Sequence, residues 1–469
     1  MTHSGGVEEI RASLSGASSA TTGAAAAVTG AAVAVTSPAG TSPAGTAHYA
    51  GARAILGASI GNALEWYDFS VYAFFAIYIS RNVFVDTGGA SALISAFLVY
   101  GVAFIARPVG AVVLGAYADR SGRRAALTLS LILMAAGSLC IAIAPPYAVL
   151  GIGAPLLIMC GRLLQGFSAG GEIGGAVSFL VEHAPPERRG GYAAWLQASM
   201  GVSNILGALT GATLSALLTP EQLGSWGWRV PFILGLSVAP VGLWLRASLE
   251  ETPAFEDARR EHATRPRHLA TSLRDVFIEE PKALCIAAGT SIVWVVSVYT
   301  LILYMPTYMQ RSVGFSPSEA FTASVVGNVV MALGCIAAGR VSDRIGRALT
   351  VRIGTILLLV ATYPVLAWVV STRTVTALVV GQTVFCAMVS IFTGSVPAVL
   401  ATLFPPRMRS TGVSLTYNFA AVVFGGFAPA VLTFLTETTH NTMAPAFYVV
   451  AAAAVSLAAL AFVPRSVSE

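Results

Sequence analysis

The sequence predicts an all-α polytopic membrane protein, with twelve transmembrane helices arranged in two pseudo-symmetric six-helix halves. Three observations support this fold class. The 469 residues are 55% hydrophobic and only 10% charged, whereas soluble proteins carry about 25% charged residues. Apolar stretches long enough to span a bilayer, which takes roughly 20 residues, recur along the chain. The same charged loop motif follows the second and the eighth of these stretches.

The first 50 residues are expected to form a disordered tail, because Ala, Thr, Ser and Gly dominate there and cannot bury a core. Twelve apolar segments follow. Their approximate limits are 54–80, 92–117, 125–144, 152–181, 191–217, 229–247, 283–309, 319–339, 348–370, 375–400, 411–436 and 443–463. The fourth is long and rich in Gly, so we expect it to kink or to project beyond the bilayer.

These spans divide six and six, into a first bundle at 51–247 and a second bundle at 283–469. The segment between them, 248–282, is charged and mixed in sign. We expect it to be a solvated cytoplasmic connector, and a regulatory module is the alternative.

Loop charges predict the orientation. With the N-terminus inside, the cytoplasmic loops and adjoining span ends hold Arg120, Arg123, Arg124, Arg188, Arg189, Arg246, Arg259, Arg260, Arg265, Arg267, Arg274, Lys282, Arg340, Arg344, Arg347, Arg352, Arg407 and Arg409. The opposite loops hold Arg81, Arg229, Arg311 and Arg373. Because cytoplasmic loops are enriched in Lys and Arg, both termini are expected in the cytoplasm, and the membrane is expected to be a bacterial inner membrane.

The two halves repeat their loop chemistry. The segment 115–124 reads GAYADRSGRR, and 339–347 reads GRVSDRIGR. A second echo follows spans four and ten, where 182–189 reads EHAPPERR and 402–409 reads TLFPPRMR. Two six-helix halves with matching loops are a transporter architecture, whose substrate site lies near the midplane between the halves.

Five charged residues lie inside the apolar segments: Glu65, Asp68, Arg107, Arg162 and Glu172. Intramembrane charges are costly and mark ion or solute pathways. At about 1.5 Å per helical residue, Glu65, Arg107 and Glu172 share a depth of about 15–18 Å from the cytoplasmic end. Asp68 and Arg162 lie farther in, at roughly 22 and 30 Å. We therefore expect an Asp68–Arg162 pair and a cluster of the other three.

Helical spacing supports this arrangement. Glu65, Asp68 and Tyr72 share one helix face, and Arg162, Gln165 and Glu172 lie along another. Three acids face two arginines, so one carboxylate would lack a partner if all were ionised. Because burial disfavours the charged form, that carboxylate should accept a proton readily. Asp68, Glu65 and Glu172 are thus the candidate proton-coupling groups. The alternative is that all five charges form structural ion pairs.

Four motifs in order resemble one family. GNALEWYDF at 61–69, the loop signature at 115–124, RLLQGFSAGGE at 162–172 and WGWRVPF at 226–232 are similar to the metabolite:proton symporters of the major facilitator superfamily. The resemblance covers about residues 53–463. It implies twelve helices, no enzymatic activity, and proton-coupled transport of solutes such as citrate, 2-oxoglutarate, shikimate, proline or betaine. A first-helix Asp and a fourth-helix Arg are similarly coupled in related sugar porters.

The resemblance also implies that the loop motif acts as a conformational latch, and a purely topogenic charge cluster is the alternative. The expected latch residues are Asp119, Arg120, Gly122, Arg123, Glu182, Asp343, Arg344 and Arg347. Glu182 is the expected partner of Arg120 or Arg123. Thr402 replaces the acid at the matching place in the second half, so that latch should rely on Asp343 and Arg344 alone and be weaker.

Substrate recognition is predicted from the same charges. Protonation of Asp68 or Glu65 should loosen its pairing with an arginine, and a freed guanidinium binds a carboxylate in a bidentate manner. The expected substrate-binding residues are Arg162, Arg107, Gln165, Tyr299 and Asn418. Gln197, Asn204, Tyr304 and Asn328 could also line the path. For each of the uncharged residues, a hydrogen bond between helices is the alternative.

Several other functions are disfavoured. The sequence shows no nucleophile–base set, no Walker motif and no metal-ligand spacing, so we expect neither an enzyme nor a metal or other cofactor. The five cysteines are expected to be buried thiols. A net charge of +5 does not suggest nucleic acid. The expected partners are a small carboxylate and protons, with the lipid bilayer around a monomer. Zwitterionic osmolytes or a shikimate-like solute are the alternative substrates, although no long coiled-coil tail of the osmosensing relatives follows the last span.

Overall fold

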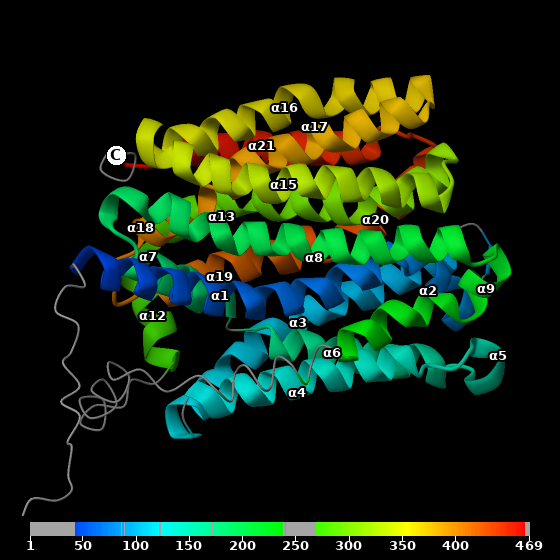
Figure 1. The fold of residues 1–469 in the computed structure, drawn as a ribbon, viewed down its shortest axis with the longest axis horizontal. Coiled ribbons are helices and arrows are strands. Elements are labelled where there is room, and N and C mark those ends of the chain that lie inside the picture. Colours follow the sequence, from blue (N-terminus) through cyan, green and yellow to red (C-terminus); the bar gives the residue numbers. More distant parts are fainter. Residues whose placement is uncertain are drawn as a thin grey trace, which may run out of the picture. The chain divides into compact units, whose positions relative to one another are not determined.

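The computed structural model describes residues 43–464 except 86, 89, 122, 171, 238–239 and 241–268. Every regular element within these ranges is a helix. The chain from His48 onward forms one compact unit, and the architecture below is that of this unit. Figure 1 shows its long helices running alongside one another.

The first half contains the first six predicted spans. Its helices are α1 (Pro43–Phe74), α2 (Ala76–Val83), α3 (Ser91–Ser121), α4 (Arg123–Ala142), α6 (Gly153–Ser168), α7 (Glu172–His183) and α8 (Arg189–Leu217). Four short elements lie in its loops: α5 (Tyr147–Leu150), η1 (Pro186–Arg188), α9 (Pro220–Ser225) and η2 (Gly227–Arg229). The sixth span is helical at 230–237, and most of its remainder lies outside the described residues.

The second half contains the other six spans, preceded by α12 (Leu269–Glu279). Its helices are α13 (Pro281–Ser297), α14 (Met305–Tyr308), α15 (Pro317–Ile345), α16 (Arg347–Thr372), α17 (Val375–Thr393), α18 (Val396–Leu403), α19 (Arg409–Ala420), α20 (Ala428–Thr439) and α21 (Ala444–Leu460). Three π-helical stretches interrupt these spans: η3 (Val298–Tyr304), η4 (Met309–Val313) and η5 (Ala421–Gly425). π-Helical turns are rare and often occur at functional sites.

These helices confirm the predicted fold class. Within the described ranges, seven helical segments are long and apolar enough to cross a membrane, and two apolar helices are shorter. The predicted tail and linker are only partly described. Residues 43–50 were predicted to be disordered, and this was wrong: they are helical, because the helix of the first span extends back to Pro43 as α1. Residues 1–42 of the tail and 248–268 of the linker lie outside the described residues.

The kink predicted in the fourth span is confirmed. α6 ends at Ser168 and α7 begins at Glu172. The glycines near this break bring α6 against the backbone of α3. A Cβ atom at Gly166 would overlap the carbonyl oxygen of Ala103, and one at Gly170 would overlap that of Arg107. Small residues allow close helix packing, and these glycines place Arg107 directly beside the broken helix.

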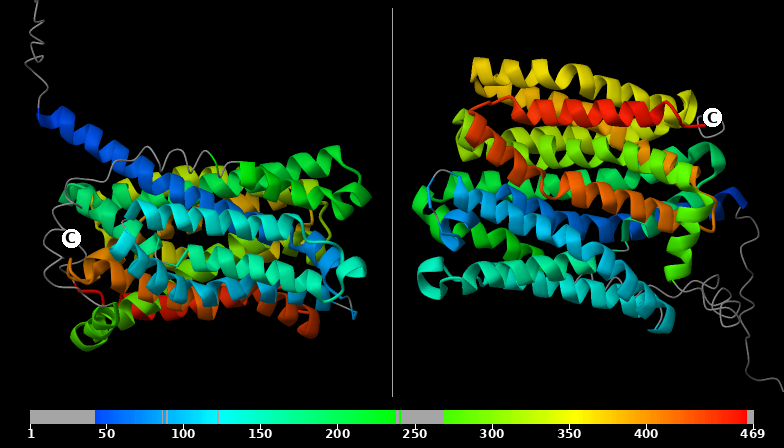
Figure 2. Two further views of the ribbon diagram at one scale, coloured as in Figure 1. Left: turned by 90° about the horizontal axis from the view of Figure 1, so that it is seen from below. Right: turned by 180° about the vertical axis from the view of Figure 1, so that it is seen from behind.

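The two halves pack through α3, α7 and α8 of the first half and α15, α19 and α20 of the second. α8 lies along α15, and α7 contacts α19 (Figure 1). The view from behind in Figure 2 shows α19 and α20 next to α3. Small residues allow the α8–α15 contact, because a Cβ atom at Gly190 would lie 2.8 Å from the carbonyl oxygen of Gly339. The α8 and α15 backbones therefore meet where the Arg-rich loops lie, which we call the basic end.

Candidate functional site

An ion pair joins α1 and α3 where the first half faces the second. Arg107 Nη2 donates to Glu65 Oε1 at 2.9 Å, and the two side chains are only 3% and 8% exposed. The guanidinium carbon of Arg107 also lies 4.7 Å from the ring centroids of Phe69 and Phe104. Aromatic faces attract cations most strongly where water is excluded. The predicted proximity of Glu65 and Arg107 is confirmed.

Asp68 and Arg162 do not form the direct pair that their depths predicted. Asp68 Oδ2 accepts hydrogen bonds from Ser138 Oγ at 2.5 Å and from Gln165 Nε2 at 3.3 Å. Arg162 Nη1 donates to Gln165 Oε1 at 2.7 Å. Gln165 thus lies between the acid and the base, which its amide allows because it donates and accepts at once. The prediction was wrong because helical rise gives depth but not lateral position.

Aromatic rings hold the Arg162 side chain. Its guanidinium carbon lies 4.5–4.8 Å from the ring centroids of Phe69, Tyr72 and Tyr100. The side chain is fully buried, and Nη2 donates to the Tyr100 carbonyl oxygen at 3.3 Å. A buried charge without a directly bonded counter-ion is costly. Arg162 is therefore sensitive to any change in the charge of Asp68, which it reaches through Gln165.

The second half closes over Arg107 with aromatic side chains. Tyr299, on η3, lies 5.2 Å from Phe104 and 6.0 Å from Trp66, measured between ring centroids. The Tyr299 ring therefore packs on the same Phe104 ring that contacts the guanidinium group of Arg107. Asn418 Nδ2 donates to the Gly170 carbonyl oxygen at 3.4 Å, across the two halves. Arg107 thus faces Tyr299 of the second half, and Asn418 bonds across the halves at Gly170, whereas Arg162 and Gln165 lie within the first half.

Several buried polar atoms around Arg107 and Arg162, and one on Asn418, have no hydrogen-bond partner. They are Arg107 Nε, Arg162 Nε, Tyr100 Oη and Asn418 Oδ1. Buried polar groups in native proteins are nearly always paired. Unpaired atoms around these two guanidinium groups leave donors and acceptors available to a polar ligand.

The other residues predicted to line the path differ in whether their polar atoms are hydrogen-bonded. Gln197 Oε1, Asn328 Oδ1 and both amide atoms of Asn204 are also buried without a partner. Tyr304 Oη instead accepts a hydrogen bond from Thr433 at 3.1 Å. This bond lies within the second half, so for Tyr304 the alternative of a contact between helices holds.

The basic end of the bundle is closed by contacts between the halves. Gly190 N and Gly191 N each donate to the Asp343 carboxylate at 2.8 Å. These amides belong to the first turn of α8, whose partial positive charge attracts an anion. Arg347 Nε donates to Asp343 at 3.2 Å, and Arg347 Nη2 donates to the Pro186 carbonyl oxygen at 2.6 Å. One carboxylate of the second half therefore binds the first turn of α8, and one guanidinium binds the loop before it.

The second-half latch was expected to rely on Asp343 and Arg344, but the structure pairs Asp343 with Arg347 instead. The Arg344 side chain is exposed, and it makes no ion pair with any described residue. Arg347 takes that place because it begins the next helix and lies one turn beyond Asp343. Sequence reasoning also missed the α8 amides, because backbone donors leave no residue signature.

Glu182 makes a second contact between the halves. Its carboxylate accepts from Arg409 Nη1 at 3.2 Å. Arg409 was overlooked as a site residue, although its place in the repeated loop at 402–409 could have identified it. Arg120 and Arg123, the expected partners of Glu182, have side chains outside the described residues. The Asp119 side chain and Gly122 also lie outside them. The Glu172 side chain also lies outside them.

The cysteines differ in part from expectation. Cys335 and Cys386 are buried, but Cys160 and Cys285 lie on the surface of the bundle. Among the described residues, no group of three or more His, Cys, Asp or Glu side chains could hold a metal ion.

Comparisons with known proteins agree with this geometry. Residues 58–385 match the family described as the Major Facilitator Superfamily. The citrate-proton symporter of Salmonella typhi is 36% identical over 409 residues, covering 87% of this chain and 93% of that protein. The glycine betaine/proline/ectoine/pipecolic acid transporter OusA of Dickeya dadantii is 32% identical over 410 residues, covering 86% and 81%. The crystal structure of a D-xylose-proton symporter matches the fold with a TM-score of 0.72 at 18% identity, covering 88% and 98%.

Proposed function

This chain belongs to the Major Facilitator Superfamily, and from this premise we propose that it is a proton-coupled symporter of a small organic carboxylate such as citrate. It is a multi-pass membrane protein and not an enzyme. Transport proceeds by alternating access, in which the two halves open in turn towards each side of the membrane around one central site.

The observation that carries the carboxylate proposal is Arg107 at the junction of the halves. Its guanidinium is buried, it is paired only in part by Glu65, and its Nε atom has no partner. A guanidinium presents donors in a planar fork that matches a carboxylate. Tyr299 and Asn418 bring polar atoms to the junction from the second half. A substrate carboxylate bound there would contact both halves, as alternating access requires.

Proton coupling follows from the two acids that hold the arginines. A proton on Glu65 removes the negative charge that competes for Arg107. A proton on Asp68 weakens the hydrogen bond from Gln165 and leaves Arg162 without its nearest counter-charge. Both changes make the site more positive, so the proton and the anionic substrate favour each other's binding. Glu172 remains a candidate for the same role.

The closed basic end shows which contacts between the halves must open for the substrate to leave on that side. In the arrangement described here, Asp343 with the α8 amides, and Glu182 with Arg409, hold the halves together at that end. Release of substrate on that side requires these contacts to break. We propose that they act as the conformational latch, together with Asp119, Arg120, Gly122 and Arg123 of the first-half loop.

The aromatic junction favours a zwitterionic osmolyte as a second candidate substrate. Trp66, Phe104 and Tyr299 pack around the place where Arg107 would hold a carboxylate. Aromatic faces bind quaternary ammonium groups, so betaine would find a partner for each of its charges. OusA is named for such solutes, and the citrate symporters for a carboxylate.

Further proposals concern the setting of the protein. The excess of Arg at the basic end supports a cytoplasmic location for both termini in a bacterial inner membrane. We also propose bundles at 51–247 and 283–469 joined by the 248–282 linker, and a monomer in the bilayer.

A liposome experiment tests the function. The purified protein is reconstituted, an inward proton gradient is imposed, and uptake of labelled citrate, 2-oxoglutarate, shikimate and betaine is followed with and without an uncoupler. Uncoupler-sensitive uptake of one carboxylate is expected. Uptake of betaine alone would favour the second candidate, and gradient-independent uptake would contradict coupling to protons.

A further inference from the structure

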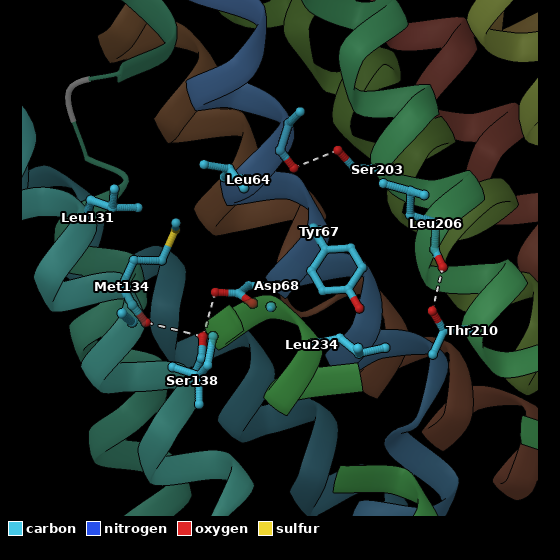
Figure 3. Close-up of a pocket in the computed structure, with 14 residues that line it drawn as sticks. Leu64, Tyr67, Asp68, Leu131, Met134, Ser138, Ser203, Leu206, Thr210 and Leu234 are labelled. Atoms are coloured by element: carbon cyan, nitrogen blue, oxygen red, sulfur yellow. Dashed lines mark hydrogen bonds between the residues drawn. The ribbon is translucent and has the colours of Figure 1, made fainter. Parts of the chain in front are cut away.

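A cavity lies inside the first half, apart from the site at the junction with the second half. It has a volume of about 260 Å³ and is bounded by α1, α4, α8 and residues 234–236 of the sixth span (Figure 3). Its wall is mostly aliphatic and includes Leu64, Leu131, Met134, Leu206 and Leu234. Such a pocket suits an apolar ligand body.

One acidic group reaches this pocket. Asp68 lines it, and Asp68 Oδ2 takes both hydrogen bonds that the carboxylate accepts from described residues. The other oxygen, Oδ1, faces the sixth span, because a Cβ atom at Gly235 would lie 3.1 Å from it. Figure 3 shows one carboxylate oxygen directed at Ser138 and the other turned away. The residue is only 5% exposed, so Oδ1 is an unpaired acceptor in a nearly closed space.

The other polar groups of the wall already use their hydrogens within the protein. Tyr67 Oη donates to the Pro231 carbonyl oxygen at 3.0 Å, and Ser203 Oγ to that of Ala63 at 2.6 Å. Thr210 Oγ1 donates to the Leu206 carbonyl oxygen at 2.8 Å. A ligand must therefore bring its own donor to Asp68 Oδ1. Arg162 does not supply one, because it reaches Asp68 only through Gln165 on the Oδ2 side.

The mouth of the pocket faces the surface of the bundle. Leu206 is 51% exposed and Leu234 is 45% exposed, and both belong to segments that cross the membrane. Entry is therefore from the hydrocarbon region of the bilayer, which concentrates apolar molecules. A ligand with an apolar body and a single cationic donor fits both the apolar wall of this pocket and the acceptor Asp68 Oδ1.

We propose that this pocket binds lipophilic amines that enter from the bilayer and place their ammonium group against Asp68 Oδ1. A bound ammonium keeps Asp68 ionised, because a cation beside a carboxylate favours its charged form. The consequence rests on the proposed function, in which Asp68 takes up a coupling proton. Such an amine inhibits proton-driven uptake without competing with the substrate, since the substrate site lies at Arg107, between the halves.

The test measures binding separately from transport. The probe is radiolabelled N,N-dimethyloctylamine, bound to the purified full-length protein, and octan-1-ol is the uncharged competitor. Ala135→Leu fills the pocket from α4, and Ala136→Leu adds the same side chain at the next position, which does not line the pocket. Asp68→Asn removes the charge but keeps the shape. Thermal unfolding of each variant verifies folding, and Leu206→Trp at the mouth replaces any blocking variant that fails to fold.

The expected result is saturable amine binding that falls at least tenfold in Ala135→Leu and in Asp68→Asn but is unchanged in Ala136→Leu, with no displacement by octan-1-ol. Equal binding in Asp68→Asn, or full displacement by octan-1-ol, would show a purely apolar site and overturn the proposal. Competitive displacement by citrate, in which the citrate needed rises in proportion to the amine concentration, would place the amine at the central site and also overturn it. Binding as expected without inhibition of uptake would leave the pocket standing and refute the coupling role of Asp68.

Discussion

Replacing Asp343 by Asn should open the basic end of the bundle. The carboxylate is 8% exposed, accepts from two backbone amides of α8 at 2.8 Å each, and also pairs with Arg347. Hydrogen bonds to charged groups contribute about 1.5–3 kcal/mol each, and an anion at a helix N-terminus contributes roughly 0.3–1 kcal/mol.

The size of the free-energy change depends on which hydrogen bonds an Asn side chain at position 343 can still accept. Its carbonyl oxygen can still accept one neutral hydrogen bond, whereas its NH₂ group faces a donor. We therefore expect a loss of about 2–3 kcal/mol in favour of the closed basic end. At 1.4 kcal/mol per factor of ten, the closed population relative to the open one should fall roughly 30- to 150-fold.

The assay is a distance distribution between two spin labels across the basic end. Glu187, before α8, and Lys282, at the beginning of α13, are exposed positions in opposite halves. They are replaced by Cys in a background free of the five native cysteines. Asp343→Asn should add a longer distance. Asp275→Asn is the matched control, because this acid on α12 makes no ion pair with any described residue.

The reasoning would be refuted if the Asp343→Asn distribution matched that of the parent protein. It would also be refuted if Asp275→Asn lengthened the distance equally, since a general loss of negative charge would then explain the change.

Three further predictions concern coupling, recognition and packing. Asp68→Asn should abolish accumulation against a gradient but retain exchange of labelled for unlabelled substrate, because only the step that takes up a proton is lost; normal accumulation would remove Asp68 from coupling. Arg107→Lys should raise the apparent KM about tenfold or more, because Lys cannot bind a carboxylate with two parallel donors; an unchanged KM in uptake assays would exclude Arg107 from the site. Gly166→Leu should destabilise the protein by about 1–3 kcal/mol or more, because its side chain would overlap the Ala103 carbonyl group. Thermal unfolding measures that loss, with Gly175→Leu as the control, since a Cβ atom there meets open space, and equal melting temperatures would contradict it.

The pairing of the intramembrane charges shows where sequence reasoning ended. Depth along a helix follows from residue number, so Glu65 and Arg107 were correctly expected to meet. Depth does not fix how helices rotate and cross. Ser138, in an apolar stretch without any signal, and Gln165, expected to bind substrate, therefore proved to be the bonded neighbours of Asp68.

The contacts of Asp343 at the basic end show a second limit of prediction from sequence. The loop motifs identified Asp343 and its surroundings, because repeated charged loops stand out against apolar spans. The partner of Asp343 is a pair of backbone amides on Gly190 and Gly191. Backbone groups are the same in every residue, so sequence can show that a helix begins nearby but not which carboxylate will cap it.

The sequence by itself determined the membrane class, the twelve spans, the two-fold repeat and the residues that carry charge into the bilayer. These properties follow from hydrophobicity and order along the chain, which are local. Only the tertiary structure decided that Gln165 separates Asp68 from Arg162, that Arg107 lies between the halves, and that Asp68 Oδ1 faces an apolar pocket. Those facts depend on helix rotation and close packing at glycines, which arise from contacts between segments far apart in the chain.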